Sequence, residues 1–181
     1  NRHFLRRFSH KLKIRVKRKH NAALHCFVCG VKNPLGLHTE FFELEDGTLA
    51  AKVTPQSCHQ SYPGRVHGGI CTALLDETIG RAINIPEPDT WAVTAEITTR
   101  YLKPVPYDVP LTVTGKVVEN NRRLFTGEGA IILPDGEVAV TATGKYRKLK
   151  IENIAEFDVS GEDWQLYPKQ DDPDFVELPE G

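Results

Sequence analysis

The sequence predicts an α+β domain in which about six antiparallel strands form a curved sheet around one long central helix. Two observations predict this class. A helical pattern from about Gly68 to Ile83 is apolar on nearly every side, so most of its surface must be covered. The segments before and after it are rich in strand-forming residues and are joined by hairpin signals. A curved sheet wrapped around the helix satisfies both observations.

The elements predicted before the helix are a turn and a hairpin. Residues 26–36 (CFVCGVKNPLG) are rich in turn residues, and the run NPLG (33–36) places Pro and Gly where a tight turn needs them. In residues 37–55 (LHTEFFELEDGTLAAKVTP), strand residues flank the run EDG (45–47), which contains the Asp-Gly hairpin signal. A proline-containing loop, residues 55–66, leads to the helix.

Only strands are predicted after the helix, which stops before Pro86. Turn signals at Asn120-Asn121 and at the run PDG (134–136) separate the later runs. The four runs rich in Val, Ile, Thr and aromatic residues are 91–104, 111–119, 123–133 and 137–149. The predicted order of elements is therefore β-β-α-β-β-β-β.

The charge distribution divides the chain of 181 residues into three parts. Residues 1–20 hold nine Lys or Arg and no acid, whereas residues 151–181 hold ten acids and one Lys. We therefore expect a basic arm (1–24), a domain (25–150) and an acidic tail (151–181), with the two extensions lying on each other or on a partner subunit. Neither should be needed for activity. Binding of the arm to nucleic acid or an anionic membrane is the weaker alternative, because the tail would compete for it.

No apolar run approaches a membrane span, and no apolar signal-peptide core follows the basic N-terminus, so the sequence predicts a cytoplasmic protein with reduced thiols. Four cysteines in a chain of this size do not form a disulfide scaffold. Cys26 and Cys29 form one CxxC pair, but a structural zinc site usually shows two ligand pairs. No metal or cofactor is therefore expected, and the two cysteines are interpreted as small side chains beside the turn.

The start of the helix and an acid in its middle are the candidate reactive groups. Gly68 and Gly69 open the helix, where the first amides lack intrahelical partners and carry the positive end of the dipole. Glycine lets a ligand approach the backbone, so this terminus suits a carbonyl oxygen that becomes negative during a reaction. Asp76 interrupts the apolar pattern and could act as a general base or as a nucleophile. The alternatives are tight packing for the glycines and a hydrogen-bonded structural acid.

The spacing of these groups predicts a dimer. Gly68 and Asp76 are eight residues apart, which is about 12 Å along a helix axis. One carbonyl carbon cannot be within reach of both groups of the same chain. If both act on one substrate, they come from two chains, and two antiparallel helices would place Gly68 of one chain beside Asp76 of the other.

The run His67-Gly68-Gly69, with Asp76 nine residues after His67, resembles the hotdog-fold thioesterases when taken with the order of elements. More narrowly, it resembles the phenylacetate-pathway (PaaI-like) acyl-CoA thioesterase branch, which the runs NPLGL (33–37) and VTAEITTRYLKP (93–104) also match. The resemblance covers about residues 25–149. It implies hydrolysis of an acyl thioester of coenzyme A or an acyl carrier to a carboxylic acid and a free thiol. It also implies a homodimer, or a dimer of dimers, with shared active sites.

The resemblance implies roles for individual residues. Asp76 is the catalytic acid, Gly68 the oxyanion donor, and Thr94 matches a position that carries a hydroxyl near the acid. His67 is expected to fix the turn by bonding to the backbone and, with Gly69, to lie beside the substrate. Glu77, which points about 100° away from Asp76 around the helix, is the second candidate acid and is expected to face a loop or the subunit interface.

The loop before the helix departs from some relatives, which carry a side-chain amide six residues before the histidine. Ser61 occupies that position here, and Gln60 or His59 could substitute for the amide. The phosphates of coenzyme A need cations at the pocket mouth. The candidates are Arg122 and Arg123 at a predicted hairpin, with Arg65 or Lys103, although such charges also serve simply as exposed turn residues.

Two other functions remain open at this point. A hotdog hydratase or dehydratase would need a catalytic His and acid in a different loop arrangement, which the sequence does not show. A non-catalytic acyl-CoA-binding or regulatory module could use the basic arm to reach nucleic acid. Gly68 and Asp76 together favour the hydrolase, whereas the acyl chain and its carrier are not defined by any motif.

Overall fold

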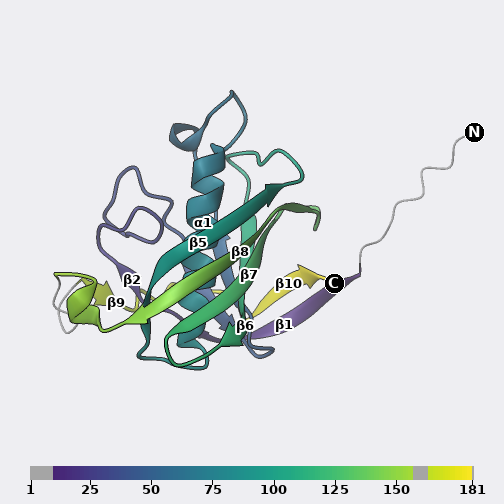
Figure 1. The fold of residues 1–181 in the computed structure, drawn as a ribbon. Helices are drawn as coiled ribbons and strands as arrows, with labels where there is room; N and C mark the ends of the chain where they lie inside the picture. Colours follow the sequence, from purple (N-terminus) through teal and green to yellow (C-terminus); the bar gives the residue numbers. More distant parts are fainter. Residues whose placement is uncertain (1–9, 157–162, 181) are drawn as a thin grey trace, which may run out of the picture.

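The computed structural model describes residues 10–156 and 163–180, and it confirms one central helix packed against a large antiparallel sheet (Figure 1). Helix α1 (Gly68–Arg81) has His67 as its N-cap and buries an apolar stripe against the sheet. Leu74, Leu75 and Ile79 are completely buried there. Among the described residues, no helix is both long and apolar enough to cross a lipid bilayer.

All six predicted strands are present, but the sheet has eight strands rather than about six, in the antiparallel order β10-β1-β3-β4-β6-β7-β8-β5. The six predicted strands are β3 (Glu40–Leu44), β4 (Leu49–Val53), β5 (Trp91–Tyr101), β6 (Leu111–Asn120), β7 (Leu124–Ile132) and β8 (Val138–Leu149). The two added strands are β1 (Lys11–Lys19) and β10 (Phe175–Pro179). A separate pair joins β2 (Ala22–Ala23) to β9 (Trp164–Gln165), and the short helices are η1 (Ser57–His59), η2 (Ala82–Asn84) and η3 (Ile151–Asn153).

The two strands that the sequence analysis missed come from the basic arm and the acidic tail. β1 pairs with β10 through Lys11–Arg15 and with β3 through Val16–Lys19, so both segments lie at one edge of the sheet (Figure 1). Their alternate apolar residues form a second small core with Leu44, Ala50 and Ile132, on the face of the sheet away from α1. The many Lys and Arg of β1 hid this alternation in the sequence.

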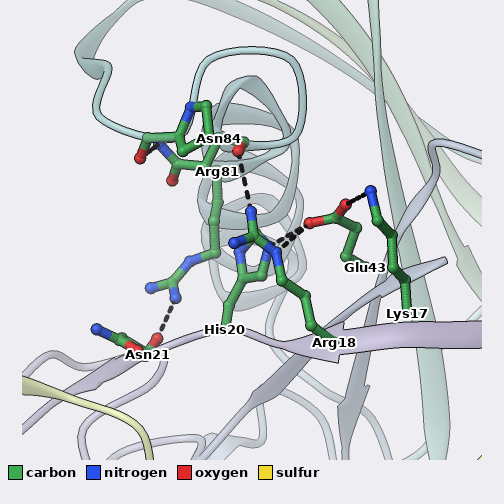
Figure 2. A network of polar contacts seen from close by, with 8 residues as sticks. Lys17, Arg18, His20, Asn21, Glu43, Arg81 and Asn84 are labelled. Atoms are coloured by element: carbon green, nitrogen blue, oxygen red, sulfur yellow. Dashed lines mark hydrogen bonds and ion pairs between the residues drawn. The ribbon is translucent and has the colours of Figure 1, made fainter.

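Opposite charges hold the N-terminal strand in place. The Nζ atom of Lys19 lies 2.7 Å from Glu40 and 2.6 Å from Asp172, so the basic segment bonds to both the sheet and the acidic segment. Figure 2 shows a second network around Glu43, whose carboxylate contacts Lys17 at 3.1 Å and Arg18 at 2.5 Å. Glu43 is only 1% exposed, so these cations compensate a buried charge.

The same network connects the N-terminal segment to the end of α1 (Figure 2). Nη2 of Arg18 donates to the carbonyl of Asn84 at 3.4 Å, and Nη1 of Arg81 donates to the carbonyl of Asn21 at 2.5 Å. The basic segment is thus joined to the helix that carries Gly68 and Asp76.

Deleting the charged segments should destabilise the domain, contrary to the expectation that they are dispensable. A fragment of residues 21–150 loses β1 and β10, so Leu44, Ala50 and Ile132 lose the apolar side chains that cover them and β3 loses its neighbouring strand. Burial of one large apolar side chain contributes about 1.5–3 kcal/mol, which is a large part of the stability of a typical domain. We expect a lower urea midpoint for the fragment than for the full chain. A fragment as stable as the full chain would show that the two strands contribute nothing to stability.

His20 should make stability depend on pH. Burial and the nearby Arg81 guanidinium lower the pKa of His20 from 6.5 to about 4. Unfolded chains therefore take up a proton below pH 6.5 that folded chains refuse until about pH 4, so stability falls as the pH drops through this window. Between pH 7 and pH 5, His20 should reduce the free energy of unfolding by roughly 2 kcal/mol. Urea unfolding at both pH values measures this, and His20→Gln should flatten the dependence.

The control for this measurement is His10→Gln, because His10 is exposed.

Glu43 affects stability at lower pH than His20 does. Burial opposes its ionisation, but its bonds to Arg18, Lys17 and His20 outweigh burial and keep the pKa of Glu43 below its usual 4.5. The stability due to Glu43 is therefore lost only as the pH falls below about 4.5. If the free energy of unfolding changes equally with pH in the wild type and in His20→Gln, His20 is not the group that makes stability depend on pH.

Candidate functional site

The first turn of α1 forms one half of the candidate site. The side chain of His67 caps the helix, its Nδ1 accepting from the backbone N–H of Gly69 at 2.9 Å. The carbonyl of Gly68 accepts from the hydroxyl of Tyr101 at 2.7 Å, and Thr72 lies 2.7 Å from the same hydroxyl. His67 therefore occupies the amide of Gly69, which leaves the amide of Gly68 as the one to face a ligand.

Packing within this chain does not require glycine at position 68. A Cβ atom added there would lie 3.5 Å from the ring of Tyr101, which is an ordinary contact. The space beside Gly68 belongs to a hollow of about 550 Å³, whose lining includes Tyr62, Arg65, Tyr101 and Lys103. Two of the candidate phosphate-binding cations thus lie at the Gly68 end, with Lys103 also paired to Glu137.

The loop before the helix places its polar residues differently. Gln60 and Ser61 are exposed, with Gln60 Oε1 at 3.5 Å from the hydroxyl of Tyr107 and the N–H of Ser61 donating to Arg65 at 2.9 Å. His59, in contrast, is 2% exposed, and both of its ring nitrogens have backbone partners. The ring of His59 is therefore a structural link, and Gln60 is the side-chain amide of this loop nearest in sequence to the expected position.

Asp76 forms the other half of the candidate site. Its Oδ1 accepts from the hydroxyl of Thr94 on β5 at 2.8 Å and from the hydroxyl of Tyr146 on β8 at 3.1 Å. The ring of Tyr146 stacks on Phe125, with ring centroids 4.8 Å apart, and is buried. Burial and the Asp76 carboxylate raise the pKa of Tyr146 above its usual 10, so its hydroxyl remains a donor to Asp76.

Tyr146 is the site residue that sequence reasoning missed. It lies in an ordinary strand pattern, and no motif distinguishes it from a core tyrosine. Its contact with Asp76 joins residues 70 positions apart and depends on how the sheet curves over the helix. Asp76, Thr94 and Tyr146 together line a hollow of about 440 Å³ that also includes Gly80 and Trp91.

The two halves lie about two turns apart along α1 and border the same strand. Thr94 and Tyr101 of β5 contact Asp76 and Gly68 respectively. β5 is the last strand of the sheet and pairs only with β8 within the described residues. Arg122 and Arg123 line neither of the two hollows. They are exposed at the turn between β6 and β7, where the carbonyl of Arg123 accepts from the N–H of Lys148.

Glu77 points away from Asp76, toward the loop that contains Cys26 and Cys29. Its Oε1 accepts from Nη2 of Arg81 at 2.6 Å, and the same Nη2 lies 3.4 Å from Sγ of Cys29. The thiol of Cys29, together with backbone amides of the loop, lowers the pKa of Cys26 to about 6. Glu77 thus bonds to Arg81 and faces the cysteine loop, while Glu77 and Arg81 also line the hollow that contains Asp76.

Comparison with known proteins identifies the domain. Residues 63–140 match the model of the thioesterase superfamily. The crystal structure of the thioesterase superfamily protein RHA08564 is 36% identical over 67% of this chain, with a TM-score of 0.63. This chain covers 62% of that protein's length. None of the curated proteins matches this chain.

Two further structures share the fold. The BH2602 protein from Bacillus halodurans, crystallised with CoA, is 29% identical over 61% of this chain and 74% of its own, with a TM-score of 0.55. The E. coli PaaI protein from the phenylacetic acid degradation operon is 19% identical over 62% of this chain and 80% of its own, with a TM-score of 0.57, which shows the fold alone. The matched residues include all of α1, with Gly68 and Asp76; this part of the chain is therefore similar to the thioesterase superfamily, and the domain has the hotdog fold.

Proposed function

We propose that this protein is an acyl-CoA thioesterase of the PaaI-like branch, which hydrolyses an acyl thioester to a carboxylic acid and a free thiol in the cytoplasm. The observation that carries the proposal is the placement of the Gly68 helix terminus and the Asp76–Thr94 pair in two hollows along one edge strand. The related BH2602 protein was crystallised with CoA, which supports coenzyme A as the carrier here.

We further propose that two chains complete each site. An antiparallel pairing of two β5 strands about a two-fold axis near Ile97 and Thr98 would bring Thr94 of one chain opposite Tyr101 of the other. The Asp76 hollow of one subunit would then meet the Gly68 hollow of its partner. The side of α1 that carries Gly69, Thr72 and Ala73 is only partly covered in this chain, and its small residues suit close packing of a second helix. A dimer of dimers would repeat the same two-site unit.

The chemistry follows from the charges that develop. Asp76, oriented by Thr94 and Tyr146, takes a proton from water as the oxygen of that water attacks the thioester carbon. The carbonyl oxygen becomes negative and is stabilised by the amide of Gly68 in the other chain and by the positive end of that helix. Collapse of the intermediate breaks the C–S bond, and the proton on Asp76 passes to the leaving sulfur. Direct attack by Asp76 is the alternative, and it would place the incoming oxygen label in the Asp76 side chain during a single turnover in labelled water.

Cations around this composite pocket would hold the phosphates of coenzyme A. Arg65 lines the Gly68 hollow, and Arg122 and Arg123 lie on an exposed turn. We propose that Arg65, with Gln60 and Ser61 nearby, serves the substrate in its own chain's hollow, and that Arg122 and Arg123 approach the pocket from the other side.

The test is thiol release from a panel of acyl-CoAs, measured with a thiol-reactive dye. We expect release of one thiol per acyl group with at least one short-chain, aromatic or long-chain substrate. A folded protein that binds acyl-CoA in a calorimeter without releasing thiol would identify a non-catalytic acyl-CoA-binding module. Hydration of an enoyl-CoA without thiol release would instead identify a hydratase.

Tyr146→Phe should lower kcat while leaving the fold intact. Phenylalanine keeps the stacking on Phe125 but loses the hydroxyl that donates to Asp76. A hydrogen bond to a charged group contributes about 1.5–3 kcal/mol, so kcat should fall roughly tenfold to a hundredfold. An unchanged kcat in a folded Tyr146→Phe variant would remove Tyr146 from the site.

A further inference from the structure

The turn that holds Cys26 and Cys29 is built to present sulfur atoms. Sγ of Cys26 accepts from the backbone N–H of Val28 at 3.3 Å and of Cys29 at 3.4 Å. The N–H of Gly30 donates to the carbonyl of Cys26 at 2.8 Å and closes the turn. A Cβ atom at position 30 would lie 2.3 Å from that carbonyl oxygen, so the turn requires glycine. Backbone amides directed at a sulfur favour the thiolate form, which is the form that binds metals.

A third donor reaches this turn from the helix. Ligand atoms of Cys26, Cys29 and Glu77 all lie within 4.8 Å of one another. In a tetrahedral zinc site with Zn–S near 2.3 Å and Zn–O near 2.1 Å, such atoms lie about 3.4–3.8 Å apart. The three side chains therefore need only small adjustments to share one ion. Cys26 and Cys29 lie outside both hollows of the proposed hydrolytic site, whereas Glu77 borders the Asp76 hollow.

We propose that Cys26, Cys29 and Glu77 bind one Zn²⁺ ion, with water at the fourth position. Two thiolates and a carboxylate form a mixed sulfur and oxygen donor set that suits this borderline-soft ion. Their three negative charges would balance the two charges of the ion and the single charge of Arg81. Such a balance matters here, because Cys29 and Arg81 are 2% and 6% exposed.

Arg81 would orient the ligands instead of competing with the ion. Both of its contacts with Glu77 use Oε1, at 3.2 Å from Nε and 2.6 Å from Nη2, so this pair does not occupy Oε2. Nη2 also lies 3.4 Å from Sγ of Cys29. The guanidinium is itself fixed by the ring of Phe41, at 4.2 Å from its centroid. Hydrogen bonds of this kind from a neighbouring residue to a ligating side chain raise the affinity of metal sites.

The consequence is a loop anchored to the helix by metal coordination. Residues 26–30 lie far from α1 in sequence, and a bound ion would join them to the turn of the helix that also carries Asp76. The ion would therefore stabilise the folded chain, which presents all three ligands together, more than the unfolded chain, and it would stiffen the helix next to the proposed acid.

The experiment uses the full-length chain, freed of metal under reducing conditions and titrated with Zn²⁺ and, separately, with Co²⁺. We expect one ion per chain, a higher melting temperature with Zn²⁺, and thiolate-to-cobalt charge-transfer absorption with Co²⁺. Cys29→Ser should abolish the absorption, and Glu77→Gln should weaken Zn²⁺ binding at least tenfold. The matched control is Cys58→Ser, which removes an exposed cysteine outside the cluster and should bind as the wild type does.

Three outcomes would overturn the proposal. The first is binding of less than one Zn²⁺ or Co²⁺ ion per chain by protein whose melting curve shows it to be folded. The second is binding that survives Cys29→Ser, or that Cys58→Ser removes equally. The third is a Cys26–Cys29 disulfide that forms in air and accounts for every change at the cluster, which would make the pair redox-active instead. None of these measurements depends on thioester hydrolysis. A failure of the proposed thioesterase function can therefore be distinguished from a failure of the proposed metal site.

Discussion

Replacing Asp76 with asparagine should lower kcat by about 10²–10⁴-fold, which is the usual contribution of a positioned general base. Asparagine keeps the shape of the side chain and can still accept from Thr94 and Tyr146 through its carbonyl oxygen. It can neither take up the proton of the attacking water nor act as the nucleophile. The KM for acyl-CoA should change little, because the pocket is unaltered. Steady-state thiol release at saturating acyl-CoA measures the effect.

Two controls define what the Asp76→Asn result means. Asp89→Asn makes the same chemical change at an exposed acid and should leave kcat unchanged. Glu77→Gln tests the second candidate acid and should be milder, because Glu77 bonds to Arg81 and faces the cysteine loop. If Glu77→Gln costs more activity than Asp76→Asn, and melting curves show both proteins folded, the catalytic acid is Glu77.

Mixing two inactive variants should restore activity if each site draws on two chains. One variant carries Asp76→Asn, and the other carries Gly68→Val, whose branched side chain fills the hollow beside the Gly68 amide. In a mixed dimer, one site receives both defects and the other receives neither. Activity should reappear at up to about half of the wild-type level per mixed dimer. The activity of the two variants is measured before and after subunit exchange, with each variant alone as the baseline.

The complementation test needs proof that mixed dimers form. Differently labelled subunits that show energy transfer after mixing supply this proof, and Gly68→Ala indicates whether the position tolerates a small side chain, since a Cβ there meets only an ordinary contact. Subunit exchange without recovered activity would exclude a site shared by Gly68 and Asp76. Light scattering that finds a fully active monomer would exclude it as well.

The sequence by itself determined the central architecture, because the signals involved are local. The apolar pattern of α1, the alternating runs of six strands and the Asp-Gly turns each depend on residues a few positions apart. Local spacing also placed Gly68 at a helix start and Asp76 two turns along the same helix, and this spacing alone fixes their separation along the helix axis.

Only the tertiary structure decided the features that depend on pairing between distant segments. β1 carries too much charge to be recognised as a strand, and β10 is a short segment of the acidic tail. The two strands pair with each other and share a small apolar core, and Lys19 of β1 adds ion pairs to Glu40 and Asp172. Tyr146 reaches Asp76 because β8 curves across the helix, and Glu77 reaches the cysteine turn because the 26–30 loop packs against α1. Contacts of this kind leave no period or spacing in the sequence, since the folded chain alone brings the two partners together.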